Sequence, residues 1–334
     1  MKFVHSGTPI LVLVLSASAF ADQRLFPVVQ GGKHAFIDRD GKVVVHAQYD
    51  NARNFHDGLA AVKLDGKWGF INADGKLVIP AQYEDVGDFH DGLAHVESKE
   101  GLLKKRYGFI DKEGKVVVGY EFSKAGDFKN GLAPVEKDGL WGYIDKTGKF
   151  VIPAQFSSAN DFNDGLAEVK SGGDLGGKCG YIDTKGSFVI NPRYEDCGSF
   201  NDGLAPVEIN DKWGFVSKNG ETAIEPQFDS VQHFSNGLAA VRIGGLVAGK
   251  FGYVDKSGKM QINPQFTDAR PFYDSLAAVK VEGKWGYIDT DGKVVIPAQF
   301  DEAGGFEDGL ARVKTSNGHA WIDKKGKYTW QATK

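Results

Sequence analysis

The chain has 334 residues, of which 41% are hydrophobic, 25% charged and 12% aromatic, and this composition excludes wholesale disorder. The net charge of −4 provides no polybasic surface, so we expect no nucleic-acid partner. Glycine is the outlier at 44 residues, about twice its usual share, whereas 11 prolines and the absence of a Gly-X-Y period exclude collagen.

The first 21 residues have the pattern of an export signal. A lysine near the start precedes the apolar stretch Ile10–Leu15, and Ala19 and Ala21 stand at positions −3 and −1 of a signal-peptidase site. The apolar stretch is much shorter than the roughly 20 residues that span a bilayer, which disfavours a membrane anchor. We therefore predict cleavage between Ala21 and Asp22, one repeat domain over residues 22–334, and a periplasmic or extracellular protein without an integral membrane segment.

The rest of the chain repeats one pattern nine times, and we number the copies as units 1 to 9. Each unit has a position, the tryptophan slot, that is followed by Gly or Ala, an aromatic residue, and Ile or Val. The slot residues are His34, Trp68, Tyr107, Trp141, Cys179, Trp213, Phe251, Trp285 and His319. A glycine follows each slot after seven residues, and after 17 more comes the glycine of a Phe-x-Asp/Asn-Gly-Leu-Ala phrase, replaced once, by Ser275.

Each unit predicts three short strands. In unit 2 they are Leu59–Leu64, Trp68–Ile71 and Lys76–Pro80, rich in β-branched and aromatic residues and separated by Asp-Gly turns. The pattern therefore predicts an all-β fold of nine three-stranded antiparallel meanders with almost no helix. The connection between units carries a Phe at one position in every case, so we expect the connection to pack down on the fold.

The repeat resembles a known family. The segment Lys67–Ala94, KWGFINADGKLVIPAQYEDVGDFHDGLA, and its copies through Ile322 are similar to the WG-repeat family of bacterial proteins. The resemblance implies an all-β interaction array, often in envelope-associated or exported proteins, with no shared catalytic residues.

The spacing of the slots alternates between short and long. Successive slots are 34, 39, 34, 38, 34, 38, 34 and 34 residues apart, and the extra length lies in three long hairpins, Ser98–Arg106, Ser171–Lys178 and Ile243–Lys250. Trp occupies the slot only in even units. Blades of a closed propeller are equivalent, and a two-unit pattern does not close over nine units. The alternation therefore favours an open, solenoid-like stack, with a β-propeller as the alternative.

The two cysteines are predicted to form a disulfide. The residue 18 positions after each slot is small or β-branched, as if the slot ring rested on it within the unit, and in unit 5 both positions are cysteine, Cys179 and Cys197. In an oxidising compartment, closing this span would stabilise the fold by about 3 kcal/mol. Two buried free thiols are the alternative, because a Trp–Ala contact can hold Cα atoms more than about 7 Å apart.

Neither a metal site nor an active site is expected. No Cys-x-x-Cys indicates zinc, and His56 and His90, at one equivalent position in adjacent units, fit solvated turns better than metal ligands. Carboxylates recur in one turn environment, whereas a catalytic pair needs two contrasting environments. The recurring residues are Asp38, Asn72, Asp111, Asp145, Asp183, Asp255, Asp289 and Asp323. We expect no enzymatic activity and no cofactor.

The long hairpins carry the candidate binding residues. Their tips combine glycine with apolar side chains at regular intervals, which is typical of contact sites on projecting loops. The candidates are Leu102, Leu103, Lys104, Lys105, Arg106, Leu175, Leu246 and Val247. The alternative to a binding role is that each tip folds back and only packs on the surface of a neighbouring unit.

The sequence predicts a non-enzymatic binding or scaffold protein of the cell envelope whose partner is an unidentified envelope protein. A carbohydrate- or peptidoglycan-binding module is the alternative, because repeated aromatic residues with an outward face could stack on the sugar rings of a cell-wall glycan.

Overall fold

The computed structural model describes residues 25–100, 104–172, 177–245 and 247–332. The predicted signal segment, with its cleavage site at Ala21 and Asp22, lies outside these residues. So do four candidate binding residues, namely Leu102, Leu103, Leu175 and Leu246. The described residues form nine antiparallel sheets and no helix, which confirms the all-β class and the nine units.

Each unit forms one sheet, which we call a blade and number as its unit. Blades 1 to 3 contain β1 (Phe26–Gln30), β2 (Lys33–Ile37), β3 (Val43–Tyr49); β4 (Asn51–His56), β5 (Leu59–Leu64), β6 (Lys67–Asn72), β7 (Leu77–Tyr83); β8 (Leu93–Glu100), β9 (Lys104–Asp111) and β10 (Val116–Phe122). Blades 4 to 6 contain β11 (Lys124–Ala125), β12 (Ala133–Lys137), β13 (Leu140–Ile144), β14 (Phe150–Phe156); β15 (Ser158–Ala159), β16 (Ala167–Ser171), β17 (Lys178–Ile182), β18 (Phe188–Tyr194); β19 (Leu204–Ile209), β20 (Lys212–Ser217) and β21 (Thr222–Phe228). Blades 7 to 9 contain β22 (Ser230–Val231), β23 (Leu238–Ile243), β24 (Lys250–Asp255), β25 (Met260–Phe266); β26 (Asp268–Tyr273), β27 (Leu276–Val281), β28 (Lys284–Asp289), β29 (Val294–Phe300); β30 (Glu302–Glu307), β31 (Leu310–Thr315), β32 (Gly318–Asp323) and β33 (Tyr328–Gln331).

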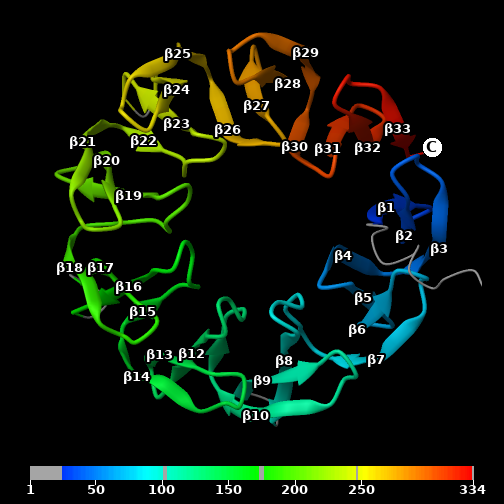
Figure 1. Cartoon of the computed structure of the whole chain (residues 1–334). Helices are drawn as coiled ribbons and strands as arrows, with labels where there is room; N and C mark the ends of the chain where they lie inside the picture. The colour runs from blue at the N-terminus through cyan, green and yellow to red at the C-terminus, as the bar shows by residue number, and fades with distance from the viewer. Residues whose placement is uncertain (1–24, 101–103, 173–176, 246, 333–334) are drawn as a thin grey trace, which may run out of the picture.

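The nine blades are arranged in a ring around a central axis and form a β-propeller (Figure 1). The open stack that the alternation favoured is therefore wrong, and the alternative arrangement is the observed one. The two-unit pattern is interrupted at the junction of the ring. Blades 9 and 1 are neighbours. Both have histidine in the slot, at His319 and His34, and neither has a long hairpin.

The connection between units supplies an additional inner strand. In blade 2 this strand pairs Asn51 with Lys63, so most blades have four strands rather than the predicted three. In blade 3 the inner segment pairs through isolated bridges, such as that between Val86 and Val96. The recurring Phe of the connection lies on this segment and is buried, which confirms that the connection is packed down.

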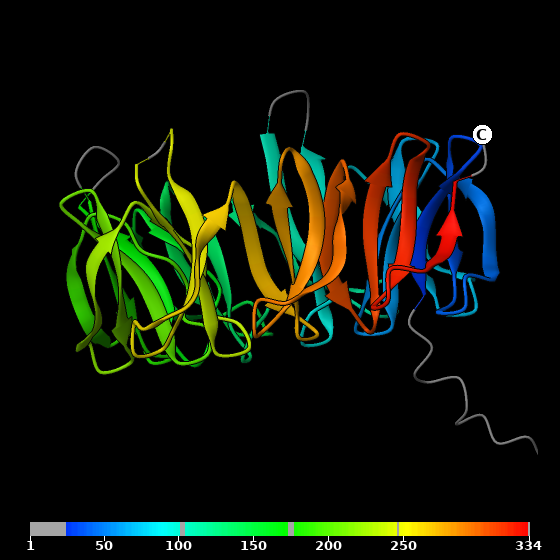
Figure 2. The same cartoon turned by 90° about the horizontal axis from the view of Figure 1, so that it is seen from above.

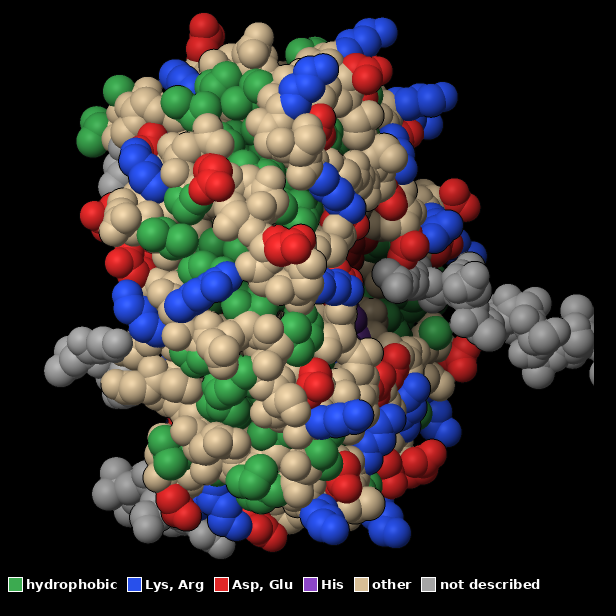
Figure 3. Space-filling model, turned by 60° about the vertical axis from the view of Figure 1, so that its left-hand side comes forward, with side chains coloured by type: hydrophobic (Ala, Val, Ile, Leu, Met, Phe, Trp, Pro, Cys, Tyr) green, Lys and Arg blue, Asp and Glu red, His purple; other side chains and the backbone are tan. Residues whose placement is uncertain are grey.

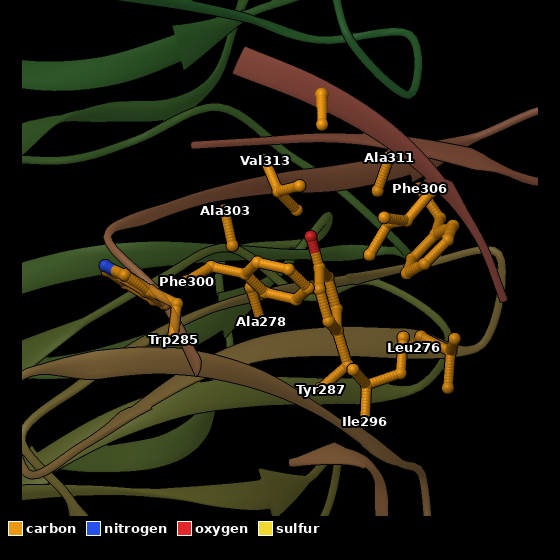
Figure 4. Close-up of a cluster of buried hydrophobic side chains, with 12 residues drawn as sticks. Leu276, Ala278, Trp285, Tyr287, Ile296, Phe300, Ala303, Phe306, Ala311 and Val313 are labelled. Atoms are coloured by element: carbon orange, nitrogen blue, oxygen red, sulfur yellow. The ribbon is translucent and has the colours of Figure 1, made fainter. Parts of the chain in front are cut away.

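The core lies between the blades. At the interface of blades 8 and 9, shown in Figure 4, Tyr287 packs against Phe306 with ring centroids 4.8 Å apart. The Tyr287 hydroxyl donates a hydrogen bond to the backbone oxygen of Gly304 at 2.9 Å, and burial raises the pKa of this tyrosine. Each apolar blade face is thus covered by the next blade, and the same contact recurs around the ring.

Two glycine positions show why the composition is unusual. A Cβ on Gly286, directly after a slot, would lie 2.6 Å from the backbone oxygen of Ile296 on the outer strand, so only glycine fits under that strand. Gly292 has a φ of +80°, and a Cβ there would lie 3.2 Å from Ile262 of the preceding blade. The glycine excess therefore reflects close packing and tight turns.

The turns between inner strands and their partners link neighbouring blades. The Asp or Asn of each such turn in blades 2 to 9 has a positive φ. In six of these turns its side chain accepts a hydrogen bond from the backbone N–H one residue further along the same turn of the next blade, at 2.7–3.0 Å. The pairs are Asp57 with Gly92, Asp91 with Gly131, Asp164 with Gly203, Asp202 with Gly237, Asn236 with Ser275, and Asp274 with Gly309.

The junction of blades 9 and 1 uses a different set of contacts. The described part of blade 1 has three strands, and among the described residues its first strand, β1, pairs with no strand on its inner side. Trp321 packs on Phe26 with ring centroids 5.0 Å apart and donates from Nε1 to the Pro27 oxygen at 3.1 Å. Arg39 pairs with Asp308 at 3.3 Å. Among the described residues, these contacts join blades 9 and 1.

The predicted disulfide between Cys179 and Cys197 is present, with Cα atoms 6.3 Å apart. Cys179 lies on β17 of blade 5, whereas Cys197 lies on the inner segment of blade 6, where it bridges to Val207. The bond therefore joins neighbouring blades, and the expectation that both positions meet within one structural unit is wrong, because the connection belongs to the next blade.

We predict that Asp164→Ala lowers the free energy of unfolding by about 1–2 kcal/mol. Alanine removes the acceptor for the Gly203 N–H and tolerates the positive φ of this position poorly. Asp164→Asn is the matched control, because asparagine occupies the equivalent turn position at Asn130 and Asn236. Urea unfolding measures both variants, and an equal loss in both would show that charge, rather than the hydrogen bond and backbone, is responsible.

We also predict that the double variant Cys179→Ala, Cys197→Ala is about 3 kcal/mol less stable than the oxidised protein. Denaturant unfolding with and without a reductant measures this loss, and the reductant should affect only the native sequence. Two reactive thiols in unreduced, unfolded protein would contradict the prediction.

Candidate functional site

The strands that lead into the three long hairpins meet these hairpins on the same face of the ring, uppermost in Figure 2, which we call the upper face. They join β8 to β9, β16 to β17, and β23 to β24, in blades 3, 5 and 7. In blade 3 the pairing of β8 with β9 extends to Glu100 and Lys104. In an even blade such as blade 2, the corresponding pairing ends at Leu64 and Lys67, so it is shorter. Among the described residues, the strand pairing thus extends further onto the upper face in blade 3 than in an even blade.

Two basic candidate residues of the blade 3 hairpin, Lys105 and Arg106, interact with other residues of the same blade. Lys105 Nζ lies 3.0 Å from Glu97 Oε2, and Arg106 donates to the Glu121 backbone oxygen at 3.4 Å. Lys104 lies on β9. On the blade 7 hairpin, Val247 is 99% exposed. The structure therefore brings Lys104, Lys105 and Arg106 together in one strand and places Val247 on a separate projection.

A groove of about 430 Å³ lies at the base of the blade 3 hairpin, between blades 2 and 3. Glu97 is only 2% exposed there and accepts a hydrogen bond from the Tyr107 hydroxyl at 3.0 Å. Burial, together with Glu97, raises the pKa of Tyr107 to about 12. Tyr120 also lines the groove. This groove was not predicted from the sequence, although Tyr120 stands where the other outer strands have alanine or proline.

Titratable side chains of the inner strands form a line across blades 2 to 4. The rings of His56 and His90 lie 5.1 Å apart, and His90 Nε2 lies 3.6 Å from Asp127 Oδ2 in the next blade. His95 Nδ1 lies 3.2 Å from Asp127 Oδ1. Burial opposes ionisation of Asp127, but His95, His90 and Lys129 outweigh it and lower its pKa. Among the described residues no three such side chains are grouped to hold a metal ion.

A second groove, of about 470 Å³, continues this inner wall across blades 4 to 6, and we call it the inner groove. Its lining residues are Gly126, Lys129, Pro134, Trp141, Ala159, Asn160, Asp161, Asn163 and Ser199. Lys129 Nζ lies 3.3 Å from Asp161 Oδ2, and burial raises the pKa of Asp161. Asn160 donates from Nδ2 to Glu168 Oε2 at 3.0 Å.

Glu168 is a buried carboxyl group behind the inner groove. It is 8% exposed, and burial raises its pKa to about 7. Equivalent positions of other blades carry Ala61, Pro134 and Ala278, so the carboxyl group is specific to blade 5. Asn160 satisfies one of its oxygens.

The recurring carboxylates predicted to lie in turns do so. Asp38 Oδ1 accepts hydrogen bonds from the backbone N–H groups of Asp40 and Lys42 at 3.0 and 2.9 Å. The same pair of bonds recurs at Asp111, Asp145 and the equivalent turns of other blades. These side chains therefore stabilise the turns.

The outer wall of the ring carries mixed side chains. Figure 3 shows Lys and Arg interspersed with Asp and Glu, with hydrophobic side chains between them. Several exposed hydrophobic residues lie near the start of outer strands, including Val116, Val117, Val151, Val189, Val294 and Val295. The side shown presents no patch of a single charge sign.

The comparisons with known proteins establish the family. The family model described as "WG containing repeat" matches residues 35–68, 68–101, 107–141, 141–173, 180–213, 213–246, 251–285 and 285–318. The chain therefore belongs to the WG-repeat family, as the sequence resemblance indicated. No curated protein sequence matches the chain.

Solved structures with a similar fold are distant in sequence. Apo AztD from Citrobacter koseri is 12% identical, with a TM-score of 0.44 over 93% of this chain and 94% of that chain. KlHsv2 with loop 6CD replaced by a Gly-Ser linker is 9% identical, with a TM-score of 0.43 over 82% of this chain and 96% of that chain. Likeness at this level carries no functional argument.

We predict that Glu168→Gln changes the pH dependence of stability. Because the pKa of Glu168 is raised from 4.5 to about 7, the folded protein holds a proton that the unfolded chain releases between these values, and stability falls as the pH rises through this window. The variant should gain about 3 kcal/mol over the native protein between pH 4.5 and pH 8.

Urea unfolding at several pH values measures this difference. Glu225→Gln, at an exposed position of β21, is the control and should follow the native pH profile. A constant difference between the native protein and Glu168→Gln across the range would contradict the prediction.

Proposed function

We propose that this WG-repeat protein is a non-enzymatic binding scaffold, exported to the cell envelope, that holds a protein partner on its upper face. The observation that carries the proposal is the placement of the three long hairpins on one face, from alternate blades of one ring. Projecting loops on a rigid frame are frequent binding sites. The fully exposed apolar side chain of Val247, on the blade 7 hairpin, also supports a binding role for the upper face.

The frame supports this role because neighbouring blades are joined around the ring. Repeated Asp–Gly hydrogen bonds, such as Asp164 with Gly203, join the blades, and the disulfide between Cys179 and Cys197 fixes blades 5 and 6. A rigid frame lowers the conformational entropy that binding must overcome. The hairpins of blades 3, 5 and 7 would thus be presented at fixed separations.

Export is part of the proposal. The signal-like pattern of residues 1–21 and the disulfide between Cys179 and Cys197 support an oxidising compartment, either the periplasm or the medium. Among the described residues no helix is long and apolar enough to cross a membrane. The use of the recurring carboxylates as turn caps supports a non-enzymatic role.

We predict that shortening the three long hairpins by about four residues each, to the length of the even units, leaves the fold intact and abolishes partner capture. Cross-linked pull-downs from envelope extract compare the native and shortened proteins, and urea unfolding checks that both are folded. The native protein with its tips intact should retain a partner that the shortened protein loses. Capture of the same partner by the shortened protein would refute the role of the upper face.

The second candidate is a carbohydrate- or peptidoglycan-binding module, and the partly exposed Trp141 of the inner groove favours it. Sedimentation with purified peptidoglycan distinguishes the two candidates. Retention in the pellet that soluble glycan competes away would favour this second candidate over a protein partner.

A further inference from the structure

The tryptophans of the slot differ in what covers them. Trp68 is 6% exposed and Trp285 is 5% exposed. In each case an arginine of the same blade's inner strand lies over the indole ring, Arg53 at 4.8 Å from the Trp68 centroid and Arg270 at 5.0 Å from that of Trp285. These two rings are therefore closed off from the inner wall of the propeller.

Trp141 in blade 4 has no such cover. The inner-strand position that holds Arg53 and Arg270 in blades 2 and 8 is Gly126 in blade 4. Trp141 is correspondingly partly exposed and, with Gly126, lines the inner groove. Lys124 lies near the ring, with Nζ 5.7 Å from its centroid, but belongs to a different position of the inner strand. Trp213 of blade 6, with Gly198 at the same position, is also partly exposed. Glycine at this position thus leaves the ring uncovered, and the inner groove lies at Trp141, where residues of blade 5 complete the lining.

The opposite side of the groove is polar and built by blade 5. Asn160, Asp161 and Asn163 line it, and Ser199 of the next inner segment extends it. Asn160 is anchored on the buried Glu168, and Asp161 on Lys129 of blade 4. The polar side chains are thus held in place by groups that lie behind or beside them, which favours recognition of a ligand of defined shape.

The chemistry of this lining indicates a class of ligand. An indole ring offers an apolar surface for stacking, and amide, hydroxyl, ammonium and carboxylate groups offer both hydrogen-bond donors and acceptors. Lys129 and Asp161 pair with each other, so the groove has no excess charge to attract an ion. A neutral ligand with an apolar ring face and many hydroxyl groups fits all of these features. The volume of about 470 Å³ lies within the roughly 300–1,000 Å³ of small-molecule sites.

We propose that the inner groove is a saccharide-binding site in which Trp141 stacks on a pyranose ring and Asn160, Asp161 and Asn163 hydrogen-bond its hydroxyl groups. This site is separate from the upper face, so it does not depend on capture of a protein partner. It also gives the carbohydrate-binding alternative a defined location.

The test titrates the full mature protein with three neutral tetrasaccharides by calorimetry: β-1,4-linked N-acetylglucosamine, cellotetraose and maltotetraose. At least one should bind, and Trp141→Phe should weaken its binding roughly tenfold through loss of stacking area. Trp285→Phe is the matched control, since this slot tryptophan lies under Arg270, and it should bind like the native protein. Thermal unfolding of both variants confirms that they are folded.

Asp161→Asn gives a second, shape-conserving variant and should also weaken binding, because it replaces a carboxylate acceptor and breaks the pair with Lys129. Binding of none of the three saccharides would overturn the proposal, as would equal weakening by Trp141→Phe and Trp285→Phe. The protein with shortened hairpins should bind the saccharide normally, so failure of the upper-face proposal and failure of this one are distinguishable.

Discussion

The ring depends on one aromatic contact that is repeated at eight of its nine blade interfaces. The aromatic residue two positions after each slot packs on the inner-strand Phe of the next blade, with centroids 4.7–5.4 Å apart at eight interfaces. A blade of about 34 residues cannot bury both of its apolar faces alone. Each face therefore needs a neighbour. A closed ring leaves no bare end face, whereas an open stack leaves two.

The ninth interface shows how this requirement is met where the repeat ends. Blade 1 has no inner-strand Phe among its described residues, so Trp321 of blade 9 packs on Phe26 instead. The larger ring also reaches the Pro27 carbonyl with its N–H, at 3.1 Å. The equivalent residues of other blades are Phe or Tyr, and Trp321 is thus an adaptation to closure that could be read from the sequence.

Much of the fold followed from residue spacing, because the repeat places the same residue types at the same positions. The strands, the nine units and the bond between Cys179 and Cys197 are of this kind. Closure did not follow from the spacing, because the alternation of Trp and of hairpin length suggested unequal neighbours throughout. Blades 9 and 1, where the alternation is interrupted, are distant in sequence and become neighbours only in the ring. Ring closure depends on the rotation between blades, which spacing alone does not specify.

The candidate sites were predictable only in part, for a related reason. Hairpin length is visible in the sequence, but the contacts of Lys105 with Glu97 and of Arg106 with Glu121 depend on neighbouring strands. The grooves at Tyr120 and Trp141 have signals in the sequence. Tyr120 departs from the alanine or proline of its position, and Trp141 departs from Trp68 and Trp285 in having glycine, Gly126, where they have arginine. In a repeat, such departures are more informative than the shared pattern.

This difference between shared and variable positions bears on function. The shared positions, such as the Phe at 306 and the glycine at 286, maintain packing at every blade and leave little room for change. The variable positions are not needed for this packing, so their residues can differ from blade to blade. Glu168 occupies one of them at a cost in stability, because its buried carboxyl group has a pKa of about 7, and an alanine there, as in blade 2, would avoid this cost. A costly polar group that anchors Asn160 behind the inner groove is typical of a functional position.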